Sequence, residues 1–316
     1  MRREKQSGWR SNLVLKYFGF VQMEFQIHHG DAIEHMATMD AASVDLAVFS
    51  PPFPSMYAYT SSERDIGNSE DFKGDAKLHL AFFYHQLARL IKPGRVVVVH
   101  VMQIPRMKRS GEVGLHDFRG LNIRIGERAG LVYEYDWMVR KNPQAQAIRT
   151  RSRELQFAGL ESDRAKQRGT LNDYLIKFRA PGENVTPIQS REQVSRNDWI
   201  AWAEGCWSDI RETDTLNVSE GRGVDDTKHI CPLQLGVINR IVRMYSNPGE
   251  LVFSPFTGIG SEGYTALKLG RKFYGCELKD EYYKAAIANC ERAVASVNND
   301  VQMGFEFDDS EVASCK

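Results

Sequence analysis

The stretch Val44-Asp45-Leu46-Ala47-Val48-Phe49-Ser50-Pro51-Pro52-Phe53 decides the fold of this chain. Its first six residues are apolar except for Asp45, which predicts a buried strand. The two prolines end that strand directly after Ser50, because proline cannot donate to a sheet ladder and fixes φ. In an open α/β sheet, ligands bind beyond the carboxyl ends of strands. Ser50 and Phe53 are therefore predicted to face a ligand site. A short polar side chain beside an aromatic ring suits a flat base with an amino group. The alternative is a strand followed by a turn without function.

The segments on both sides of this stretch alternate between strand and helix patterns. Alternating or β-branched apolar runs predict strands at residues 24–28, 95–101, 131–139, 173–178, 251–254 and 273–277. Apolar residues at helical spacing predict helices at residues 33–39, 77–91, 118–129, 232–245, 261–269 and 280–295, with Pro232 in the first turn of its helix. Strands joined by helix-length connections favour an α/β fold with a doubly wound, mainly parallel sheet.

Composition limits the class of protein. The chain has 316 residues and is 42% hydrophobic, which is enough for one large core or two small ones. Its 41 basic and 41 acidic residues balance, so any surface that binds nucleic acid must be local. The five cysteines include no C-x-x-C pair, and no run approaches the roughly 20 apolar residues of a membrane span. We therefore expect a soluble, cytoplasmic protein that uses neither a metal nor a membrane.

Residues 140–170 form a basic stretch, with eight basic and three acidic side chains and hence a local charge of +5. A surface that contacts the phosphates of a nucleic acid needs such an excess, although a solvated insertion could carry it too. The candidate nucleic-acid-binding residues are Arg149, Arg151, Arg153, Arg164, Lys166 and Arg168. The tryptophans that follow, at 199, 202 and 207, are expected to pack in the core rather than to stack on bases.

A second constellation spans residues 251–277. The strand predicted at 251–254 leads into Ser254-Pro255-Phe256-Thr257-Gly258-Ile259-Gly260, and a helix and a strand ending at Glu277 follow. A strand, a Gly-x-Gly turn, a helix and a strand that ends in an acid form the layout of a nucleoside-binding half. Gly258 and Gly260 would let the backbone approach a ligand closely. Glu277 could accept hydrogen bonds from both hydroxyls of a ribose.

Together these motifs resemble the DNA amino-methyltransferases that use S-adenosylmethionine, in the permuted group whose catalytic motif precedes the cofactor motif. Ser50-Pro51-Pro52-Phe53 is similar to the family's (Asp/Asn/Ser)-Pro-Pro-(Tyr/Phe) motif, and residues 253–260 to its Asp-Pro-Phe-x-Gly-x-Gly motif. His229-Ile230-Cys231-Pro232-Leu233 resembles the His-Pro-x-x-Lys-Pro segment that closes over the cofactor. Gly30-Asp31 resembles the turn whose acid lies near the adenine. The resemblance covers residues 25–295 and is weakest over 145–225.

The resemblance implies a Rossmann-like methyltransferase sheet, circularly permuted, with an inserted target-recognition region. We expect a basic extension at 1–22, a methyltransferase domain at 23–296 and an acidic tail at 297–316. The tail is expected to be disordered over 300–316, which hold five acids and one lysine. The expected parts of the domain are a catalytic half (23–140), a target-recognition insertion (141–228) and a cofactor-binding half (229–296).

The resemblance also implies direct methyl transfer to the exocyclic amino group of a flipped base, without a covalent enzyme intermediate. The implied catalytic residues are Ser50, Pro51, Pro52 and Phe53. The implied cofactor-binding residues are Asp31, His229, Pro232, Ser254, Pro255, Phe256, Gly258, Gly260 and Glu277. Two positions depart from the family pattern: Ser254 stands where Asp is usual, and Cys231 where Lys is usual. Both departures put the affinity for the cofactor in question.

The family that this chain resembles associates serine in the first motif position mostly with cytosine N4, so the resemblance favours cytosine N4 as the target, with adenine N6 as the alternative. Two rival hypotheses are a methyltransferase that acts on RNA or protein, and a DNA-binding module that no longer uses its cofactor. The implied partner is double-stranded DNA. A homodimer, a cognate restriction nuclease, and an orphan or phage enzyme all stay open.

Overall fold

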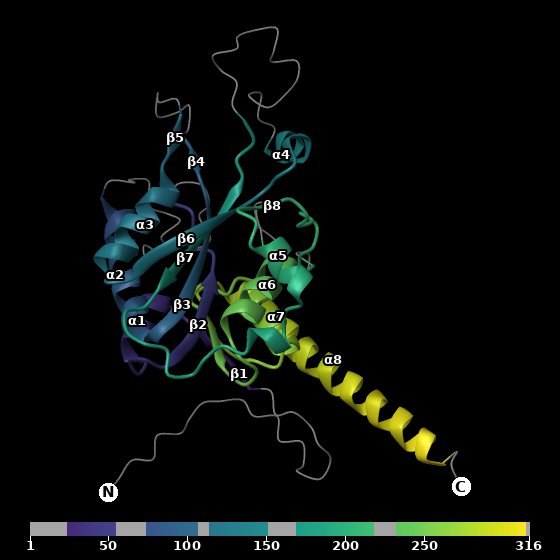
Figure 1. Ribbon diagram of the computed structural model, residues 1–316. Helices are drawn as coiled ribbons and strands as arrows, with labels where there is room; N and C mark the ends of the chain where they lie inside the picture. The colour runs from purple at the N-terminus through teal and green to yellow at the C-terminus, as the bar shows by residue number, and fades with distance from the viewer. Residues whose placement is uncertain (1–23, 55–73, 107–113, 151–168, 218–231, 314–316) are drawn as a thin grey trace, which may run out of the picture.

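The computed structural model describes residues 24–54, 74–106, 114–150, 169–217 and 232–313, with backbone alone at 149–150 and 300–313. These residues form an eight-stranded sheet with helices on both faces (Figure 1). In spatial order the strands are β1 (Phe25–His29), β10 (Lys272–Glu277), β9 (Leu251–Ser254), β2 (Val44–Phe49), β3 (Ile91–Met102), β7 (Asp173–Arg179), β6 (Val132–Val139) and β8 (Cys206–Trp207). β7 runs antiparallel to its neighbours β3 and β6, and the other pairs are parallel. The predicted doubly wound, mainly parallel α/β sheet is confirmed.

Helices cover both faces of this sheet. One face carries α1 (Ala32–Thr38), α2 (Asp75–Leu90) and α3 (Phe118–Arg128). The other carries α5 (Arg196–Trp202), α6 (Leu235–Tyr245), α7 (Ser261–Lys268) and α8 (Asp280–Ala313). The short helix α4 (Pro143–Thr150) and the strand pair β4 (Ile104–Pro105) and β5 (Leu115–His116) lie beyond the upper end of the sheet in Figure 1. Within the described ranges, no helix is both long and apolar enough to cross a membrane.

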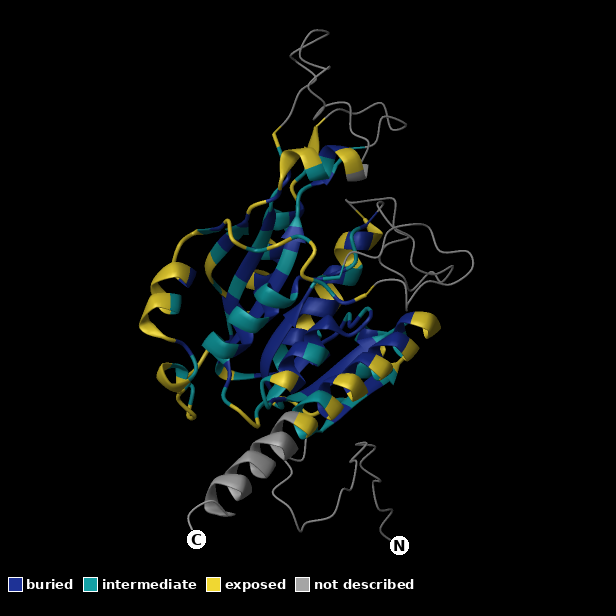
Figure 2. Ribbon diagram, turned by 90° about the vertical axis from the view of Figure 1, so that its right-hand side faces the viewer, coloured by how far each residue is buried: buried dark blue, intermediate teal, exposed yellow. Residues whose placement is uncertain are grey.

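β2 is the central strand on which the two apolar layers meet. All six of its residues are buried, and in Figure 2 the strands in the middle of the sheet are mostly dark blue. Leu46 and Val48 belong to the core on the α5–α8 face, and Ala47 and Phe49 to the core on the α1–α3 face. Successive strand residues point to opposite faces. The continuous apolar run is therefore that of a strand covered on both sides.

Asp45 is the charged residue in β2, and it is paired where the strand begins. One carboxylate oxygen lies 2.6 Å from Lys92 Nζ and 3.2 Å from an Arg95 guanidinium nitrogen. The other accepts a hydrogen bond from the Leu251 amide at 3.0 Å. Burying a charge is tolerated when it is paired and hydrogen-bonded. This network joins β2, β3 and β9 at the end of the sheet opposite Ser50.

The predicted start of α6 is wrong. The helix begins at Leu235, so Pro232 lies in the extended segment before it rather than in its first turn. The Leu235 amide donates to the Asp214 carbonyl at 2.8 Å, and the Gly236 amide donates to the Asp214 carboxylate at 2.9 Å. The helix start is thus set by a residue of a distant loop, which the local pattern could not reveal.

One other expectation about the second half of the chain needs correction. The tail is not disordered over 300–313, because α8 continues to Ala313. Residues 296–313 contain no proline, so the covalent structure does not interrupt the helix. The expected insertion at 141–228 contains β7 and β8, which are strands of the sheet. Its role in target recognition stays a prediction, as does the circular permutation.

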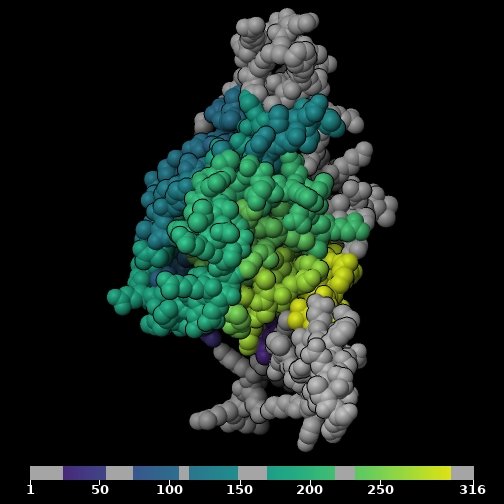
Figure 3. All heavy atoms as spheres, turned by 45° about the vertical axis from the view of Figure 1, so that its right-hand side comes forward, coloured from purple at the N-terminus to yellow at the C-terminus, as the bar shows by residue number. Residues whose placement is uncertain are grey.

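The tryptophans expected to pack in the core divide into two groups. Trp202 and Trp207 are buried in the α5–α8 layer, and the Trp207 indole donates to the Trp202 carbonyl at 3.0 Å. Trp199 is 60% exposed, so the expectation is wrong for that residue. In the space-filling view of Figure 3, the teal-to-green segment that carries them lies beside the green of α6 and α7. This segment therefore completes the α5–α8 layer.

Candidate active site

The catalytic motif lies where β2 ends. Ser50 follows the strand directly and is partly exposed, whereas Pro51 is buried. Because β2, β9 and β10 are parallel neighbours, Ser50, Ser254 and Glu277 lie at carboxyl ends of adjoining strands. Two motifs that are far apart in the sequence therefore meet at one edge of the sheet, which is where open α/β folds bind their ligands.

The end of β3 holds the Ser50 side chain. Ser50 Oγ lies 3.2 Å from the His100 carbonyl oxygen and 3.1 Å from His100 Nδ1. His100 Nε2 faces Asp173, the first residue of β7, with 2.9 Å between Nε2 and Oδ2. Lys141, two residues beyond β6, brings Nζ to 2.6 Å from the same carboxylate oxygen. A chain of four polar side chains, one from the end of each of four neighbouring strands, thus begins at Ser50.

Asp173 is ionised within this chain. The residue is 5% exposed, and burial alone would raise the pKa of its carboxyl group. The adjoining His100 and Lys141 outweigh that effect and lower the pKa below its ordinary value. Lys141 is buried as well. Buried charges held by specific partners beside a ligand-binding edge are typical of functional sites.

Aromatic side chains support both motifs. Phe53 is partly buried, and its ring centroid lies 5.5 Å from that of Phe118 in α3. Phe256, in the cofactor motif, lies 6.0 Å from Phe49 and 5.0 Å from Phe83 between centroids. Both motif phenylalanines rest on the α1–α3 core while keeping part of their surface accessible. An accessible ring on a rigid support is suited to stacking against a base.

The turn after β9 requires glycine at two positions. Gly258 has φ of +54° and Gly260 has φ of +90°, both in the left-handed region that favours glycine. A Cβ on Gly260 would lie 2.9 Å from Ala286 Cα, so no side chain fits between α7 and α8. A Cβ on Gly258 would meet no described atom within 4 Å. Gly260 therefore serves helix packing, and Gly258 leaves open space over the turn.

Glu277 organises the same turn. One carboxylate oxygen accepts from the Gly258 amide at 2.8 Å, and the other accepts from the Lys279 amide at 2.9 Å. A carboxylate can accept about four hydrogen bonds. These two bonds are therefore compatible with ribose hydroxyls as further donors, and that predicted role stays a prediction. The structure adds a role that the sequence did not suggest, because Glu277 also fixes the Gly258 backbone.

Ser254, where the family usually has Asp, is a second sign of a ligand site. Its side chain is fully buried, and its Oγ has no hydrogen-bond partner among the described residues. A buried hydroxyl without a partner costs about 1–3 kcal/mol, so a polar ligand atom at this strand end would satisfy it. Burial, together with the nearby Glu277, raises the pKa of Glu262 in α7 to about 8. Glu262 is therefore mostly neutral at pH 7 and adds little charge beside the turn.

Asp31 lies next to the same turn. The Gly30 amide donates to the Glu277 carbonyl at 3.0 Å, which places the Gly30-Asp31 turn beside the end of β10. The Asp31 carboxylate accepts from the Glu34 amide at 3.0 Å and thereby caps the amino end of α1. Asp31 therefore has a structural role as a helix cap. Its predicted contact with the adenine would be a second role and stays a prediction.

We expect Asp31→Ala to lower the free energy of unfolding by about 1 kcal/mol, because the helix cap is lost. Asp31→Asn should keep that stability, since Asn caps helices as well as Asp does. Denaturant unfolding of the two variants measures the difference. Equal losses in both would contradict the capping role. If Asp31→Asn keeps the stability of the parent protein but binds the cofactor more weakly, the contact with the ligand is a role separate from the cap.

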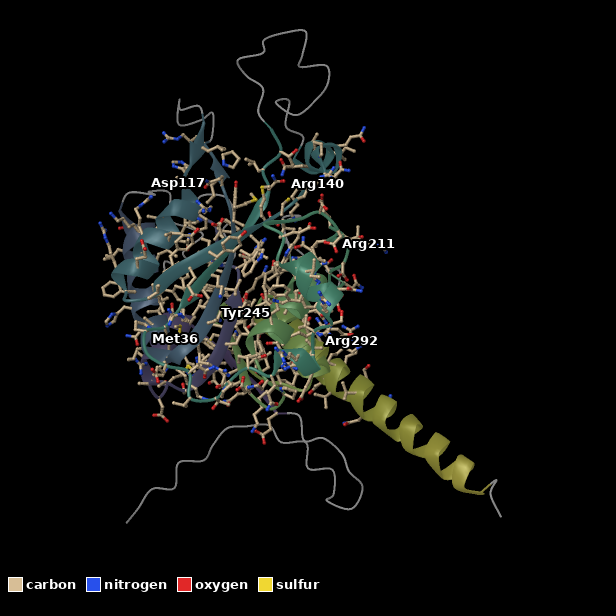
Figure 4. All side chains as sticks on the ribbon, viewed as in Figure 1. Met36, Asp117, Arg140, Arg211, Tyr245 and Arg292 are labelled. Atoms are coloured by element: carbon tan, nitrogen blue, oxygen red, sulfur yellow. The ribbon has the colours of Figure 1, made fainter. Side chains whose placement is uncertain are left out.

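Some predicted site residues lie outside the described residues. They are His229, Arg151, Arg153, Arg164, Lys166 and Arg168, together with the side chain of Arg149. Cys231, which departs from the family pattern, also lies outside them. The described start of the basic stretch is at the end of the sheet that carries α4. Figure 4 shows Arg140 there, at the same end of the molecule as Asp117, which caps α3.

Sequence reasoning missed His100, Asp173 and Lys141. A weak signal existed for two of them, because His100 interrupts the β-branched run 95–101 and Asp173 opens a predicted strand. Neither signal indicated a partner. The contact among the three residues depends on β7 lying between β3 and β6, which only the sheet order reveals.

Comparisons with known proteins agree with this arrangement. The type II methyltransferase M.BglI of Bacillus subtilis is 24% identical over 326 residues, covering 86% of this chain and 87% of that protein. The type II methyltransferase M1.MboII of Moraxella bovis is 45% identical over 58 residues, which cover 18% of this chain and only 22% of that protein. The crystal structure of TTHA0409 from Thermus thermophilus, complexed with S-adenosyl-L-methionine, has the same fold, with a TM-score of 0.65. The two sequences are 23% identical, and the match covers 85% of this chain and 94% of that chain.

A protein family also matches most of the chain. Residues 44–288 match the DNA methylase family, whose members are N6 and N4 amino-methyltransferases. This range includes Ser50, the sheet from β2 to β10 and the turn held by Glu277. The chain belongs to the DNA methylase family of N6/N4 amino-methyltransferases.

Proposed function

We propose that this protein transfers a methyl group from S-adenosylmethionine to the exocyclic amino group of a base flipped out of double-stranded DNA. The favoured target is cytosine N4. The observation that supports this most directly is the shared sheet edge. Ser50 directly follows β2, and the turn at Gly258, which Glu277 holds, lies at the ends of the adjoining β9 and β10. A base held at Ser50 and a methyl donor held at the turn would be neighbours. Such positioning is a large part of catalysis in two-substrate reactions.

The cofactor half offers groups that fit S-adenosylmethionine. The residues expected to hold it are Asp31, His229, Pro232, Ser254, Pro255, Phe256, Gly258, Gly260 and Glu277. When bound, the cofactor supplies an electrophilic methyl group on a positively charged sulfur. Glu277 would accept from ribose hydroxyls, and the buried Ser254 Oγ would gain the partner that the described residues do not provide. The open backbone at Gly258 would let the ligand approach.

The catalytic half provides groups that would make the amino group of the base more reactive. An exocyclic amino nitrogen is a poor nucleophile, because its lone pair is delocalised into the ring. Ser50 Oγ and the Pro51 carbonyl would accept its two hydrogens, so that the nitrogen can pyramidalise and direct its lone pair at the methyl group. Phe53 would stack on the base and hold its plane. The base must leave the duplex to reach these groups, so base flipping is part of the proposal.

Ser50 also favours one target base over the other. A serine hydroxyl is a weaker acceptor than a carboxylate, so it suits the amine that needs less assistance. In the family that this chain resembles, serine at this position is associated mostly with cytosine N4 and aspartate mostly with adenine N6. Adenine N6 stays the second candidate, because both bases carry an amine next to a ring nitrogen.

Nucleoside mass spectrometry of duplex DNA treated with the purified protein and cofactor tests the proposal. We expect N4-methylcytosine. N6-methyladenine without N4-methylcytosine would overturn the target base and leave the mechanism standing. DNA binding without methylation and without measurable cofactor binding would favour the alternative, a DNA-binding module.

We expect the triple variant with Arg149, Arg151 and Arg153 changed to Gln to bind DNA more weakly and with less dependence on salt. Each lost phosphate contact should lower the slope of log affinity against log salt by about 0.9, or about 2.7 for three. Fluorescence anisotropy at several salt concentrations measures the slope. A matched control replaces the exposed Arg191 and Arg196 by Gln, outside the basic stretch. A triple variant with unchanged affinity and slope would remove this stretch from the DNA interface.

The remaining parts of the proposal concern cell location and partners. We place the protein in the cytoplasm with its DNA substrate. A homodimer would appear as a second species in analytical ultracentrifugation, with and without duplex DNA. A cognate nuclease would cut the same DNA sequence only when it is unmethylated, which a digestion assay on both forms would detect.

A further inference from the structure

We propose that His100 and Asp173 are positioning residues for Ser50, forming a proton relay that makes its hydroxyl a stronger acceptor for the amino group of the target base. This inference rests on the proposed function. The path runs from Ser50 Oγ to His100 Nδ1 at 3.1 Å, and from His100 Nε2 to Asp173 Oδ2 at 2.9 Å. Ser50 is the member that would touch the substrate, and the other two act through it.

Asp173 decides which nitrogen of neutral His100 carries the proton. A carboxylate can only accept hydrogen bonds, and Lys141 Nζ at 2.6 Å stabilises its charge. The Nε2–Oδ2 contact is close without having the alignment of an ideal hydrogen bond, so its attraction is chiefly electrostatic. A lone pair on Nε2 would be repelled by the carboxylate. The proton is therefore on Nε2, and the lone pair is on Nδ1.

This tautomer sets the direction of the Ser50 hydroxyl. With a lone pair on Nδ1, the hydroxyl donates to His100 Nδ1 and keeps the Oγ lone pairs for the amine. The opposite tautomer would place an Nδ1 proton against Oγ and turn the hydroxyl toward the His100 carbonyl at 3.2 Å. One Oγ lone pair would then be used by His100. An oxygen whose proton is drawn toward an imidazole accepts more strongly, which gives a neutral serine part of the acceptor strength of an aspartate.

The relay also takes up the proton that the reaction releases. As the bond between the amino nitrogen and the methyl carbon forms, the electron pair of the breaking methyl–sulfur bond stays on sulfur. One amino proton passes to Ser50 Oγ, and the Ser50 hydroxyl proton passes to His100 Nδ1. The positive charge that began on sulfur ends on the imidazolium, beside the Asp173 carboxylate. The base leaves as a neutral methylated amine, and His100 later returns the proton to water.

The tautomer of His100 can be observed without any methyl transfer. Nitrogen-15 NMR of the histidine-labelled full chain, with His100 assigned by comparison with His100→Gln, distinguishes a protonated from an unprotonated ring nitrogen. We expect a protonated Nε2 and an unprotonated Nδ1 in the parent protein. In Asp173→Asn the preference should be lost, because an amide can donate as well as accept. A protonated Nδ1 in the parent protein would overturn the relay, whatever the protein methylates.

Kinetics test the consequence for catalysis. In single-turnover methylation of duplex DNA, Asp173→Asn and His100→Gln should each be slower by about 10–100-fold, the size of effect known for outer partners that orient metal-binding side chains. Cofactor affinity by calorimetry should stay within about twofold. The matched control is Asp136→Asn, which removes a carboxylate paired with Arg119 at 2.6 Å, outside the relay. We expect the control to keep the parent rate.

The outcomes separate the relay from the proposed function. Failure of the parent protein to methylate DNA would refute the proposed function, and the NMR result would still decide the tautomer. Normal rates in Asp173→Asn and His100→Gln, beside an active parent, would refute the relay alone. Equal slowing in Asp136→Asn would show that loss of a carboxylate ion pair, rather than the relay, causes the effect. If the variants do not fold, the NMR result on the parent protein decides.

Discussion

Replacing Ser50 by alanine should slow methyl transfer by about 10²–10³-fold, or about 2.7–4 kcal/mol in transition-state stabilisation. The hydrogen bond from the amino group to Ser50 Oγ strengthens as the nitrogen pyramidalises, so its loss affects the transition state more than the bound ground state. Cofactor affinity should be unchanged, because Ser50 directly follows β2 and is not part of the turn at Gly258 that Glu277 holds. Single-turnover methylation gives the rate, and calorimetry gives the affinity for the cofactor.

Ser43→Ala is a matched control for this variant. Ser43 precedes the same strand at its opposite end, and its Oγ has no hydrogen-bond partner among the described residues. We expect the control to methylate DNA at the parent rate. If Ser50→Ala also methylates at the parent rate, Ser50 does not hold the amino group. If it loses cofactor affinity and rate together, the two halves of the site are not separable as the structure suggests.

The second large effect is expected at Glu277. Glu277→Ala should weaken cofactor binding by about 1.5–3 kcal/mol, because hydrogen bonds to a charged carboxylate are lost. That loss corresponds to about 10–150-fold in the dissociation constant. The Gly258 amide also loses its acceptor at 2.8 Å, so the turn itself becomes less ordered. Calorimetric titration with S-adenosylmethionine measures the affinity, and thermal unfolding without cofactor verifies that the variant folds.

Two companion variants sharpen this test. Glu281→Ala removes an exposed carboxylate from the first turn of α8, close in sequence, and should leave affinity unchanged. Glu277→Gln keeps the size of the side chain and one oxygen acceptor, so its affinity should lie between those of the parent and Glu277→Ala. Parent-like affinity in folded Glu277→Ala would show that the acid serves the turn and not the ligand.

Much of the fold could be predicted from the sequence because each element carries its own period or breaker. The run 44–49 is buried from end to end and stops at the prolines, as expected. Gly258 and Gly260 have the positive φ values of a turn that requires glycine, and Gly270 ends α7 with φ of +74°. These features depend on the covalent chemistry of a few adjoining residues, so a local pattern is sufficient to find them.

The wrong predictions concern helix ends that are decided by a distant residue or by the absence of a helix-breaking proline. Pro232 is a good first helical residue by local rules, yet Asp214 caps the helix three residues later, at Leu235. The acidic composition of 300–313 suggested disorder, but α8 continues through it. The strand at 173–178 was predicted within the expected insertion, but its pairing with β3 and β6 was not. Composition does not determine which strands pair.

The sequence by itself determined the chemistry at each strand end: a hydroxyl followed by prolines after β2, a Gly-x-Gly turn after β9, and an acid at the end of β10. It could do so because a strand-ending proline and a glycine-dependent turn are local properties of the chain. Only the tertiary structure decided that His100, Asp173 and Lys141 form a chain of polar contacts that begins at Ser50. Their contacts arise because an antiparallel β7 inserts between β3 and β6, so that its first residue meets the carboxyl ends of its neighbours. Strand order is set by burial of whole faces of the sheet and not by any short stretch of residues, and for that reason it was not visible in the sequence.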